Sequence, residues 1–351
     1  MNFSKPRRLG GLPLDGRFKE VRFRSVAFSP DGQRILLSVR SSLRSDIVQM
    51  DCNGRNFRFL ASAGRTPRAY PRDDDYWDLQ MTPDGAHLLY GLCEDDEEIK
   101  TLCLLDLGTG EQKRLTDARA MQAINPRLSP DGQSVVFESW TAGTPPQLCR
   151  IALAGHDAAS LSLPNGTHPA YSPDGQQIAF LSSDYDGKTD DPLQVCVMRS
   201  DGTEVQQLTN LPDYCGEPFW HPDGQQIAFT TRAELPAGIE RSLWKYRTNL
   251  CLINTDGSHL RHLEESSSVN RIGGFGPDGR WLIYSTSGDE RFPEGKRNWD
   301  IRVLDTETGA VHTVTDNDVY DIDPLFSPDG NSILFISERD GYCGLHQMDI
   351  L

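Results

Sequence analysis

The sequence predicts an all-β protein, a β-propeller of seven four-stranded antiparallel blades. The tripeptide Pro-Asp-Gly occurs seven times, with successive prolines 43 to 55 residues apart, and each copy lies between two apolar runs. No segment shows the apolar period of an amphipathic helix. A unit of this length that recurs along a chain indicates one supersecondary element repeated in space. The copies begin at Pro30, Pro83, Pro130, Pro173, Pro222, Pro277 and Pro328.

Each repeat is expected to open with two strands joined by the Pro-Asp-Gly turn. Proline presets φ for the first turn position, and Asp and Gly tolerate the positions that follow. The run after the turn, for example Val135 to Phe137, is short, continuous and apolar, which predicts a strand buried on both faces. A third strand, such as 195–198, and a more polar fourth strand, such as 205–209, complete the unit. Four antiparallel strands in each of seven units are the architecture of a propeller.

The two ends of the chain predict how the propeller closes. The last repeat stops at 345–349, which is its third strand, and the chain begins with a strand-like segment at 6–10. We therefore expect a strand within residues 5–10 to complete blade seven, because closure removes exposed sheet edges. The repeats then occupy residues 1–351 as one domain.

Composition limits the partners and the compartment. The chain has 35 basic and 51 acidic residues, a net charge of −16, which disfavours nucleic acid and anionic membranes as partners. The eight cysteines form no Cys-x-x-Cys pair, and Cys103, Cys149, Cys196 and Cys251 fall in predicted third strands, as buried thiols of a reducing compartment do. No apolar stretch follows Arg7 and Arg8, and no segment has transmembrane length, so we expect a cytoplasmic monomer.

A candidate site follows from the register of the blades. Propeller ligands bind at the mouth of the central channel, which the starts of the first strands line. Side chains alternate along a strand, so the position three residues before the large residue that precedes each turn is expected to face this mouth. Six of these seven residues are polar: Ser25, Asp78, Asn125, His168, Glu217 and Asp323, with Ile272 in blade six.

Two interpretations of this polar position stay open. The side chains could line a hydrated channel, where they bind backbone groups and water. They could instead bind a polar small molecule or a metal ion. Carboxylates with one imidazole suit calcium or manganese, and the candidate ligands are Asp78, His168, Glu217 and Asp323.

Flanking residues extend this candidate site. Tyr76, Trp77 and Tyr320 lie near the mouth, and Arg24 and Arg271 precede the polar position in blades one and six. Aromatic rings beside carboxylates could hold a sugar or a cationic group, although such rings also serve to pack loops. The long loops 232–245 and 287–298 are expected on the opposite side of the propeller, as a partner-binding rim or as neutral insertions.

The repeats resemble the TolB-type propeller family. Ser29-Pro30-Asp31-Gly32 and three further Ser-Pro-Asp-Gly copies match its core motif, and residues 337–341 match its hairpin signal. The family includes TolB, the propeller domains of prolyl-oligopeptidase-like peptidases and oligogalacturonate lyase. The resemblance covers essentially the whole chain and implies the fold, while one fold hosts many activities. Because TolB is periplasmic, the resemblance also implies the periplasm as an alternative compartment.

Motif searches argue against most enzyme classes. The sequence has no Gly-x-Ser-x-Gly elbow, phosphate loop, dinucleotide fingerprint or His-Glu-x-x-His helix. Oligogalacturonate lyase has a histidine-rich manganese site, whereas only His168 lies at the predicted mouth. We therefore expect a non-catalytic propeller that binds a protein or a small polar or cationic ligand. The alternative is a metal-assisted carbohydrate lyase or hydrolase, with Glu217 or Asp323 as acid or base and His168 as ligand or base.

Overall fold

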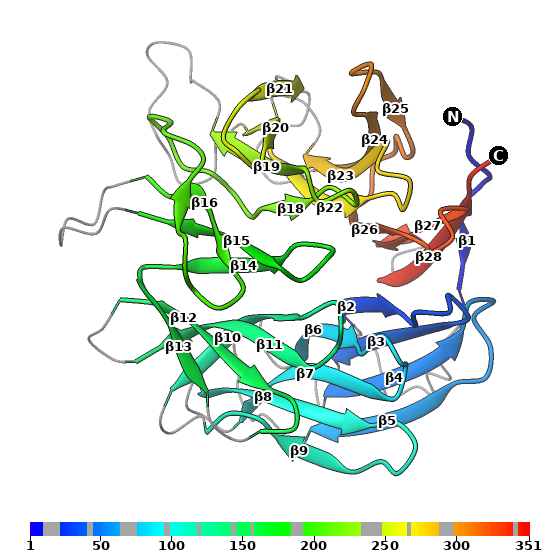
Figure 1. Ribbon diagram of the computed structural model, residues 1–351. Coiled ribbons are helices and arrows are strands. Elements are labelled where there is room, and N and C mark those ends of the chain that lie inside the picture. Colours follow the sequence, from blue (N-terminus) through cyan, green and yellow to red (C-terminus); the bar gives the residue numbers. More distant parts are fainter. Residues whose placement is uncertain are drawn as a thin grey trace. The chain divides into compact units, whose positions relative to one another are not determined.

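The structure is a computed structural model that describes residues 1–9, 22–40, 45–63, 76–94, 99–117, 121–141, 145–155, 158–183, 192–232, 248–264, 268–287, 298–339 and 343–351. Within these residues the chain forms seven four-stranded antiparallel sheets and no α-helix, which confirms the predicted seven-bladed β-propeller (Figure 1). Accordingly, no helix in this part of the chain could cross a membrane.

Six blades use four consecutive strands each. The strands of blades 1 to 3 are β2 (Arg22–Phe28), β3 (Arg34–Arg40), β4 (Ser45–Asp51), β5 (Arg58–Ala63), β6 (Tyr76–Met81), β7 (His87–Glu94), β8 (Ile99–Asp106), β9 (Gln112–Arg114), β10 (Gln122–Leu128), β11 (Ser134–Trp140), β12 (Gln147–Ala152) and β13 (Ala159–Pro164). Those of blades 4 to 6 are β14 (Thr167–Tyr171), β15 (Gln177–Ser182), β16 (Gln194–Arg199), β17 (Gln206–Gln207), β18 (Phe219–Trp220), β19 (Gln226–Arg232), β20 (Thr248–Asn254), β21 (Arg261–Glu264), β22 (Asn270–Phe275), β23 (Trp281–Ser287), β24 (Trp299–Asp305) and β25 (Val311–Thr313).

Blade 7 combines both ends of the chain. Its strands are β26 (Asp321–Phe326), β27 (Ser332–Ser337), β28 (Gly344–Asp349) and β1 (Arg7–Arg8), and their order in the sheet is β1-β28-β27-β26. The backbone N–H of Leu9 donates to the carbonyl oxygen of Leu345 at 2.9 Å. The prediction that the N-terminal strand completes blade seven is confirmed.

The chain divides into two compact units. The N-terminal unit contains Arg8–Pro169 and Tyr342–Leu345, and the C-terminal unit contains Met1–Arg7, Ala170–Gly341 and His346–Leu351. Each unit is described by itself below. That residues 1–351 behave as one domain stays a prediction.

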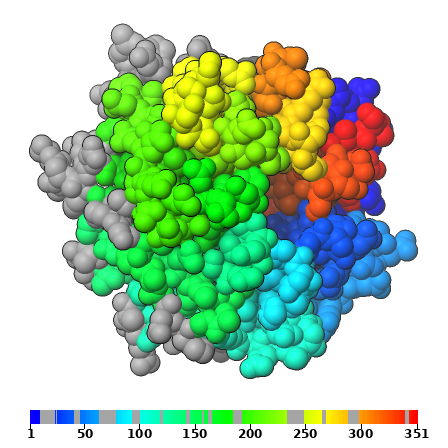
Figure 2. Space-filling view, in the orientation of Figure 1, coloured from blue at the N-terminus to red at the C-terminus, as the bar shows by residue number. Residues whose placement is uncertain are grey.

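The core of each unit lies between neighbouring blades. Val135, Val136 and Phe137 of β11 are all fully buried, and the matching residues of the other second strands are buried to the same degree, which confirms their predicted burial on both faces. Phe137 packs with Leu89 of β7 and Cys149 of β12 in one apolar cluster. Side chains of blades 2 and 3, coloured cyan to green in Figure 2, accordingly pack into a continuous body. Cys103, Cys149, Cys196 and Cys251 are buried free thiols on third strands, as predicted.

Strand pairing defines two edges of every blade. In blade 3, Gln122 at the start of β10 pairs with Trp140 at the end of β11, and Ser139 pairs with Gln147 at the start of β12. The chain therefore enters the first strand at the edge where the second strand ends and the third begins. We call this the entry edge, and the edge with the Pro-Asp-Gly turns the turn edge.

This pairing corrects the predicted location of the long loops. In blade 5 the ends of β19 and β20 pair at Arg232 and Thr248, and Cys215, which precedes β18, bridges Thr231. The flanks of the 233–247 segment thus lie at the entry edge, because successive antiparallel strands reverse direction. The prediction that these loops leave from the opposite side is wrong. Residues 233–247 and 288–297 themselves lie outside the described part of the chain.

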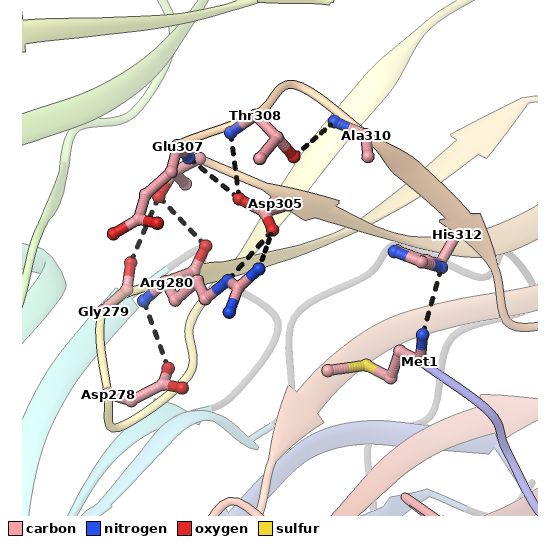
Figure 3. Close-up of polar contacts among 10 residues, drawn as sticks. Met1, Asp278, Gly279, Arg280, Asp305, Glu307, Thr308, Ala310 and His312 are labelled. Carbon is pink, nitrogen blue, oxygen red and sulfur yellow. Dashed lines mark hydrogen bonds and ion pairs between the residues drawn. The ribbon is translucent and has the colours of Figure 1, made fainter.

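Turn chemistry explains why Pro-Asp-Gly recurs at the turn edge. In blade 1 the side chain of Ser29 donates to Asp31, whose carboxylate also accepts the backbone N–H of Gln33 at 3.0 Å. These hydrogen bonds lower the pKa of Asp31, and the one from Ser29 contributes most. Figure 3 shows the blade 6 turn, where Asp278 accepts the N–H of Arg280 at 3.1 Å and the Arg280 guanidinium donates to Asp305 at 2.6 and 2.9 Å. The turn aspartates therefore serve local structure.

Candidate ligand-binding site

The predicted polar position coincides with a break in strand geometry. Asp78, Asn125, His168 and Asp323 have φ of 51°, 49°, 51° and 51°, in the left-handed region. In β6, β10 and β26 the strand register shifts at the same place, as at a β-bulge. Asp, Asn and His are the residues other than glycine that adopt this conformation most readily. Backbone conformation thus accounts for the residue types at these four positions.

The bulge also changes how the side chains must be placed. A bulge opposes two residues to one, so the strict alternation used to place these side chains fails there. In blades 1 and 6 the shift falls between Phe23 and Ser25 and between Ile272 and Gly274, which makes Arg24 and Gly273 the extra residues. Glu217 precedes β18, which begins only at Phe219. The alignment therefore finds the same region of every blade, but not one equivalent residue in each.

In the N-terminal unit the first strands of blades 1 to 3 are bound together at this position. The Ser25 hydroxyl accepts the N–H of Leu79 at 3.1 Å. The Gln80 amide donates to the carbonyl of Pro126 at 2.6 Å and accepts the N–H of Leu128 at 2.9 Å. Ser25 thus satisfies backbone between blades, as the hydrated-channel interpretation expected of such groups.

Asp78 belongs to the same set of contacts. Its carboxylate lies 3.6 Å from the guanidinium of Arg127 in β10, and both side chains are partly exposed. An ion pair of this kind between partly solvated groups adds little stability. The opposite charges of Asp78 and Arg127 do neutralise each other.

A cluster of polar groups surrounds Glu138 of β11. This side chain is only 2% exposed. Its carboxylate accepts the Asn125 amide at 3.0 Å, the backbone N–H of His168 at 3.4 Å and the indole N–H of Trp140. We call Asn125, Glu138, Trp140 and His168 the Glu138 cluster. It joins blade 3 to the first strand of blade 4, and it contains two of the six polar residues predicted from the sequence.

Three polar side-chain atoms at residues 165–168 lack partners. The Nδ1 of His168, the hydroxyl of Thr167 and the side-chain oxygen of Asn165 are buried and have no hydrogen-bond partner within the described residues. Buried polar groups are normally satisfied by protein or by ordered water. These atoms therefore have hydrogen-bonding capacity that the described residues do not use.

The C-terminal unit contains a second polar region. Asp321 is fully buried, and its Oδ2 accepts Arg339 at 2.8 Å and the Asn317 amide at 2.6 Å. Asp300 accepts the N–H of Asn317 at 3.2 Å, and burial raises its pKa to about 6. These contacts hold the segment that precedes β26, while the Oδ1 of Asp321 has no hydrogen-bond partner within the described residues.

The remaining predicted residues have other surroundings. The Arg271 guanidinium lies 5.0 Å from the ring centroid of Trp299, whose backbone bridges that of Tyr320. Tyr320 is 36% exposed, and Glu217 is half-buried. Arg24, Tyr76 and Trp77 lie in β2 and β6, but their side chains fall outside the described part of the structure.

The predicted site is thus divided between the two units. Ser25, Asp78, Asn125 and His168 belong to the N-terminal unit, and Glu217, Arg271, Tyr320 and Asp323 to the C-terminal unit. The structure brings Asn125 and His168 together through Glu138. Within the described residues, no three His, Cys, Asp or Glu side chains are placed to hold a metal ion.

Glu138 and Trp140 were not among the residues predicted from the sequence, although the repeats contain a signal for the first. The residue after the buried apolar triplet of the second strand is uncharged in the other six blades: Ser38, Gly91, Leu181, Thr230, Ser285 and Ile336. A carboxylate at the end of a buried strand needs a specific partner. Comparison of the second strands alone would have identified Glu138.

Sequence comparison places the chain near uncharacterised proteins. No family model matches it. The uncharacterized protein Atu1656 of Agrobacterium fabrum is 27% identical over 204 residues, which cover 56% of this chain and 65% of that protein. The uncharacterized peptidase YuxL of Bacillus subtilis is 26% identical over 217 residues, which cover 60% of this chain and 29% of the peptidase. The matches thus span under two thirds of these relatives.

Solved structures share the fold. An oligogalacturonate lyase in complex with manganese superposes with a TM-score of 0.70 at 19% identity, covering 94% of this chain and 91% of the lyase. TolB from Acinetobacter baumannii gives 0.52 at 19% identity, covering 84% and 63%. A puromycin-hydrolyzing peptidase of Mycobacterium tuberculosis gives 0.66 at 16% identity, covering 94% and 52%. The resemblance to TolB-type propellers is confirmed for the fold, and at these identities for the fold alone.

Proposed function

We propose that this chain is a non-catalytic propeller that binds a small polar ligand at the entry edge of its blades. The Glu138 cluster carries this proposal, because it gathers an amide, an indole, a backbone N–H and a buried carboxylate from two blades. Ligand sites typically combine a few such converging polar groups with an aromatic side chain. The unpartnered acceptors at residues 165–168 support it further.

Left-handed backbone at Asn125 and His168 is a second argument for the same location. Such conformations cost free energy and persist where the surrounding structure imposes them, often at ligand sites. Bulges near binding sites serve to re-aim side chains. Here two residues with left-handed backbone, from neighbouring blades, donate to one carboxylate.

Thermal unfolding in the presence of three ligand classes tests this function. The classes are neutral polyols, carboxylates and amines, each of metabolite size. We expect at least one class to raise the Tm of the wild type and to lose most of this effect in Glu138→Gln, because a ligand stabilises only the state that binds it. Asp46→Asn is the matched control, since Asp46 is also a 2% exposed carboxylate of the N-terminal unit. Equal Tm shifts in wild type and Glu138→Gln would contradict the proposal.

A metal-assisted carbohydrate enzyme is the second candidate. Its support is that a lyase of the same fold was solved with manganese. The described residues do not fit that metal, because Asp78 pairs with Arg127 and the atoms around the Glu138 carboxylate are N–H donors rather than metal ligands. Elemental analysis of the purified protein tests it: a stoichiometric divalent ion, lost with His168→Gly, would favour this candidate over the first.

The cytoplasmic compartment and the binding of a protein partner are also proposals. Separation of the periplasmic and cytoplasmic fractions of cells that express the full chain tests the first. Affinity capture with the wild type, compared with Arg232→Glu at the base of the 233–247 segment, tests the second.

A further inference from the structure

Within the described residues, Glu138 forms no ion pair with a cation. All three groups that donate to its carboxylate are neutral: the Asn125 amide, the Trp140 indole and the His168 backbone. Its Oε2 accepts from Asn125 and His168 and its Oε1 from Trp140, so both carboxylate oxygens face N–H donors. Burial of an unpaired charge is costly. The nearest cation of β10, Arg127, pairs with Asp78 instead.

Polar side chains without partners occur in the segment whose His168 N–H donates to Glu138. The unpartnered atoms, within the described residues, are the Nδ1 of His168, the hydroxyl oxygen of Thr167 and the carbonyl oxygen of the Asn165 side chain. Each of them can accept a hydrogen bond. A guest with N–H or O–H groups can satisfy all three, whereas a negatively charged guest would oppose Glu138.

Trp140 provides a surface for such a guest. Its indole N–H is held by Glu138, yet 44% of the residue remains exposed. The hydrogen bond to Glu138 restricts the rotamers of this indole and so fixes the exposed ring in place. Of the aromatic side chains, tryptophan attracts cations most strongly. The carboxylate on its N–H adds negative potential at the same place.

From these contacts we infer that the ligand of the Glu138 cluster carries a cationic nitrogen, an ammonium or guanidinium group. The inference rests on the proposed function, and specifies the chemical class of its ligand. The cation lies against the exposed ring of Trp140, with Glu138 as its countercharge. The overall charge of −16 favours the approach of such a ligand.

Matched probes that differ only in charge test this inference. The first pair is choline and its neutral carbon analogue 3,3-dimethylbutan-1-ol, and the second is methylguanidinium and N-methylurea. The readout is the indole N–H resonance of Trp140 in ¹⁵N–¹H spectra, identified by its loss in Trp140→Phe. With probes up to about 10 mM, where single-group binding is measurable, we expect the cations to shift this resonance with at least about tenfold lower apparent Kd than their neutral partners.

Substitution of Glu138 and changes in salt concentration test whether its charge, rather than the local fold, causes the preference for cations. Glu138→Gln should abolish the preference for cations, while the control Asp46→Asn should keep it. Should Glu138→Gln fail to fold, the salt dependence of the wild type decides. Raising salt from about 20 to about 300 mM should weaken the binding of the cationic probes and leave the binding of the neutral probes unchanged.

Each outcome bears on one proposal. Equal response to both members of a pair, or no shift with any probe, overturns the inference of a cationic ligand. If only neutral or anionic compounds raise the Tm in a Glu138-dependent way, the cationic class is wrong and the binding function stands. If no class does so, the binding function itself is wrong.

Discussion

The carboxylate of Asp300 accepts a hydrogen bond of 3.2 Å from the backbone N–H of Asn317, and so ties β24 of blade 6 to the segment that enters blade 7. The Thr315 hydroxyl and the Asn298 amide also donate to it. The carboxylate is half-buried among other acids, Asp316 and Asp321. This contact therefore has a pH dependence.

Stability should increase as the pH falls through 6. Burial, and then the nearby Asp316 and Asp321, raise the pKa of Asp300 from 3.8 to about 6 in the folded state. Between these values the folded state binds a proton that the unfolded state lacks, so its stability grows as pH decreases. Asp300→Asn should remove this contribution and raise the free energy of unfolding at pH 7.5 by about 1–2 kcal/mol, after allowance for solvent screening. Urea unfolding from pH 4.5 to 8 measures it.

Asp201→Asn is the control of opposite sign. Hydrogen bonds from Thr203 lower the pKa of Asp201. Its stabilising contribution is present above the ordinary aspartate pKa and is lost as pH falls, so this variant should lose stability at neutral pH. If both variants changed the pH profile in the same direction, the assignment to Asp300 would fail.

Two glycines of the same backbone conformation should tolerate alanine differently. Gly279 and Gly309 have φ of 76° and 74°, but a Cβ at Gly279 would lie 2.4 Å from the His221 imidazole, whereas one at Gly309 meets nothing within 4 Å. We expect Gly309→Ala to cost about 1 kcal/mol of backbone strain. Gly279→Ala should cost about 1–2 kcal/mol more because it displaces His221 from the Gly279 carbonyl, 2.9 Å away.

A double-mutant cycle isolates that steric part. His221→Ser restores the serine found in four other repeats and removes the clash. In denaturant unfolding, the double variant His221→Ser/Gly279→Ala should therefore be more stable than the sum of the two single effects predicts. Strict additivity would show that His221 does not restrict the Gly279 turn.

Gln80 should contribute more to the stability of the protein than a partly exposed strand residue usually does. Its side chain bonds both the carbonyl of Pro126 and the N–H of Leu128, which couples blades 2 and 3. Gln80→Met retains the length but leaves both backbone groups unsatisfied, so we expect a loss of about 2–3 kcal/mol in the free energy of unfolding. The exposed Gln133→Met should change it by less than about 0.5 kcal/mol. An equal loss in both variants would contradict the coupling.

Substitutions at His168 should separate backbone strain from ligand binding. Its φ of 51° is tolerated by glycine and disfavoured for alanine. His168→Gly should retain wild-type stability or exceed it, and His168→Ala should lose about 1 kcal/mol. Both variants remove the imidazole, so the ligand-induced Tm shift should fall equally in both. If the ligand-induced Tm shift fell only in the less stable variant, His168 would have a purely structural role.

The sequence predicted more of the fold than of the site, for a physical reason. Pro-Asp-Gly turns and buried strands such as 135–137 are local patterns, and they defined seven blades and the closing strand. The predicted polar position coincides with left-handed backbone in four blades. Its bulges were not predicted, because αL at Asn125 and His168 depends on pairing with the next strand.

The partners of the polar groups are the least predictable part. That Asn125 and His168 meet at Glu138 depends on contacts between blades, and no periodicity encodes these. Ser25 was a candidate site residue in the sequence, but it binds neighbouring backbone, as the side chain of Gln80 does. Only the pairing of the blades distinguishes a polar side chain that satisfies the backbone from one that is left without a donor.

The pairing of β1 with β28 also has a consequence for biosynthesis. Arg7 and Arg8 are synthesised long before their partner strand Gly344–Asp349. At 5–20 residues per second, translation leaves β1 without this partner for roughly 20–70 s. During that time two exposed arginines, rather than apolar residues, form the unpaired edge, and charged residues discourage pairing with a wrong chain. Blade 7 therefore closes only after the strands of the other six blades have been synthesised, and the charge of β1 protects this edge until then.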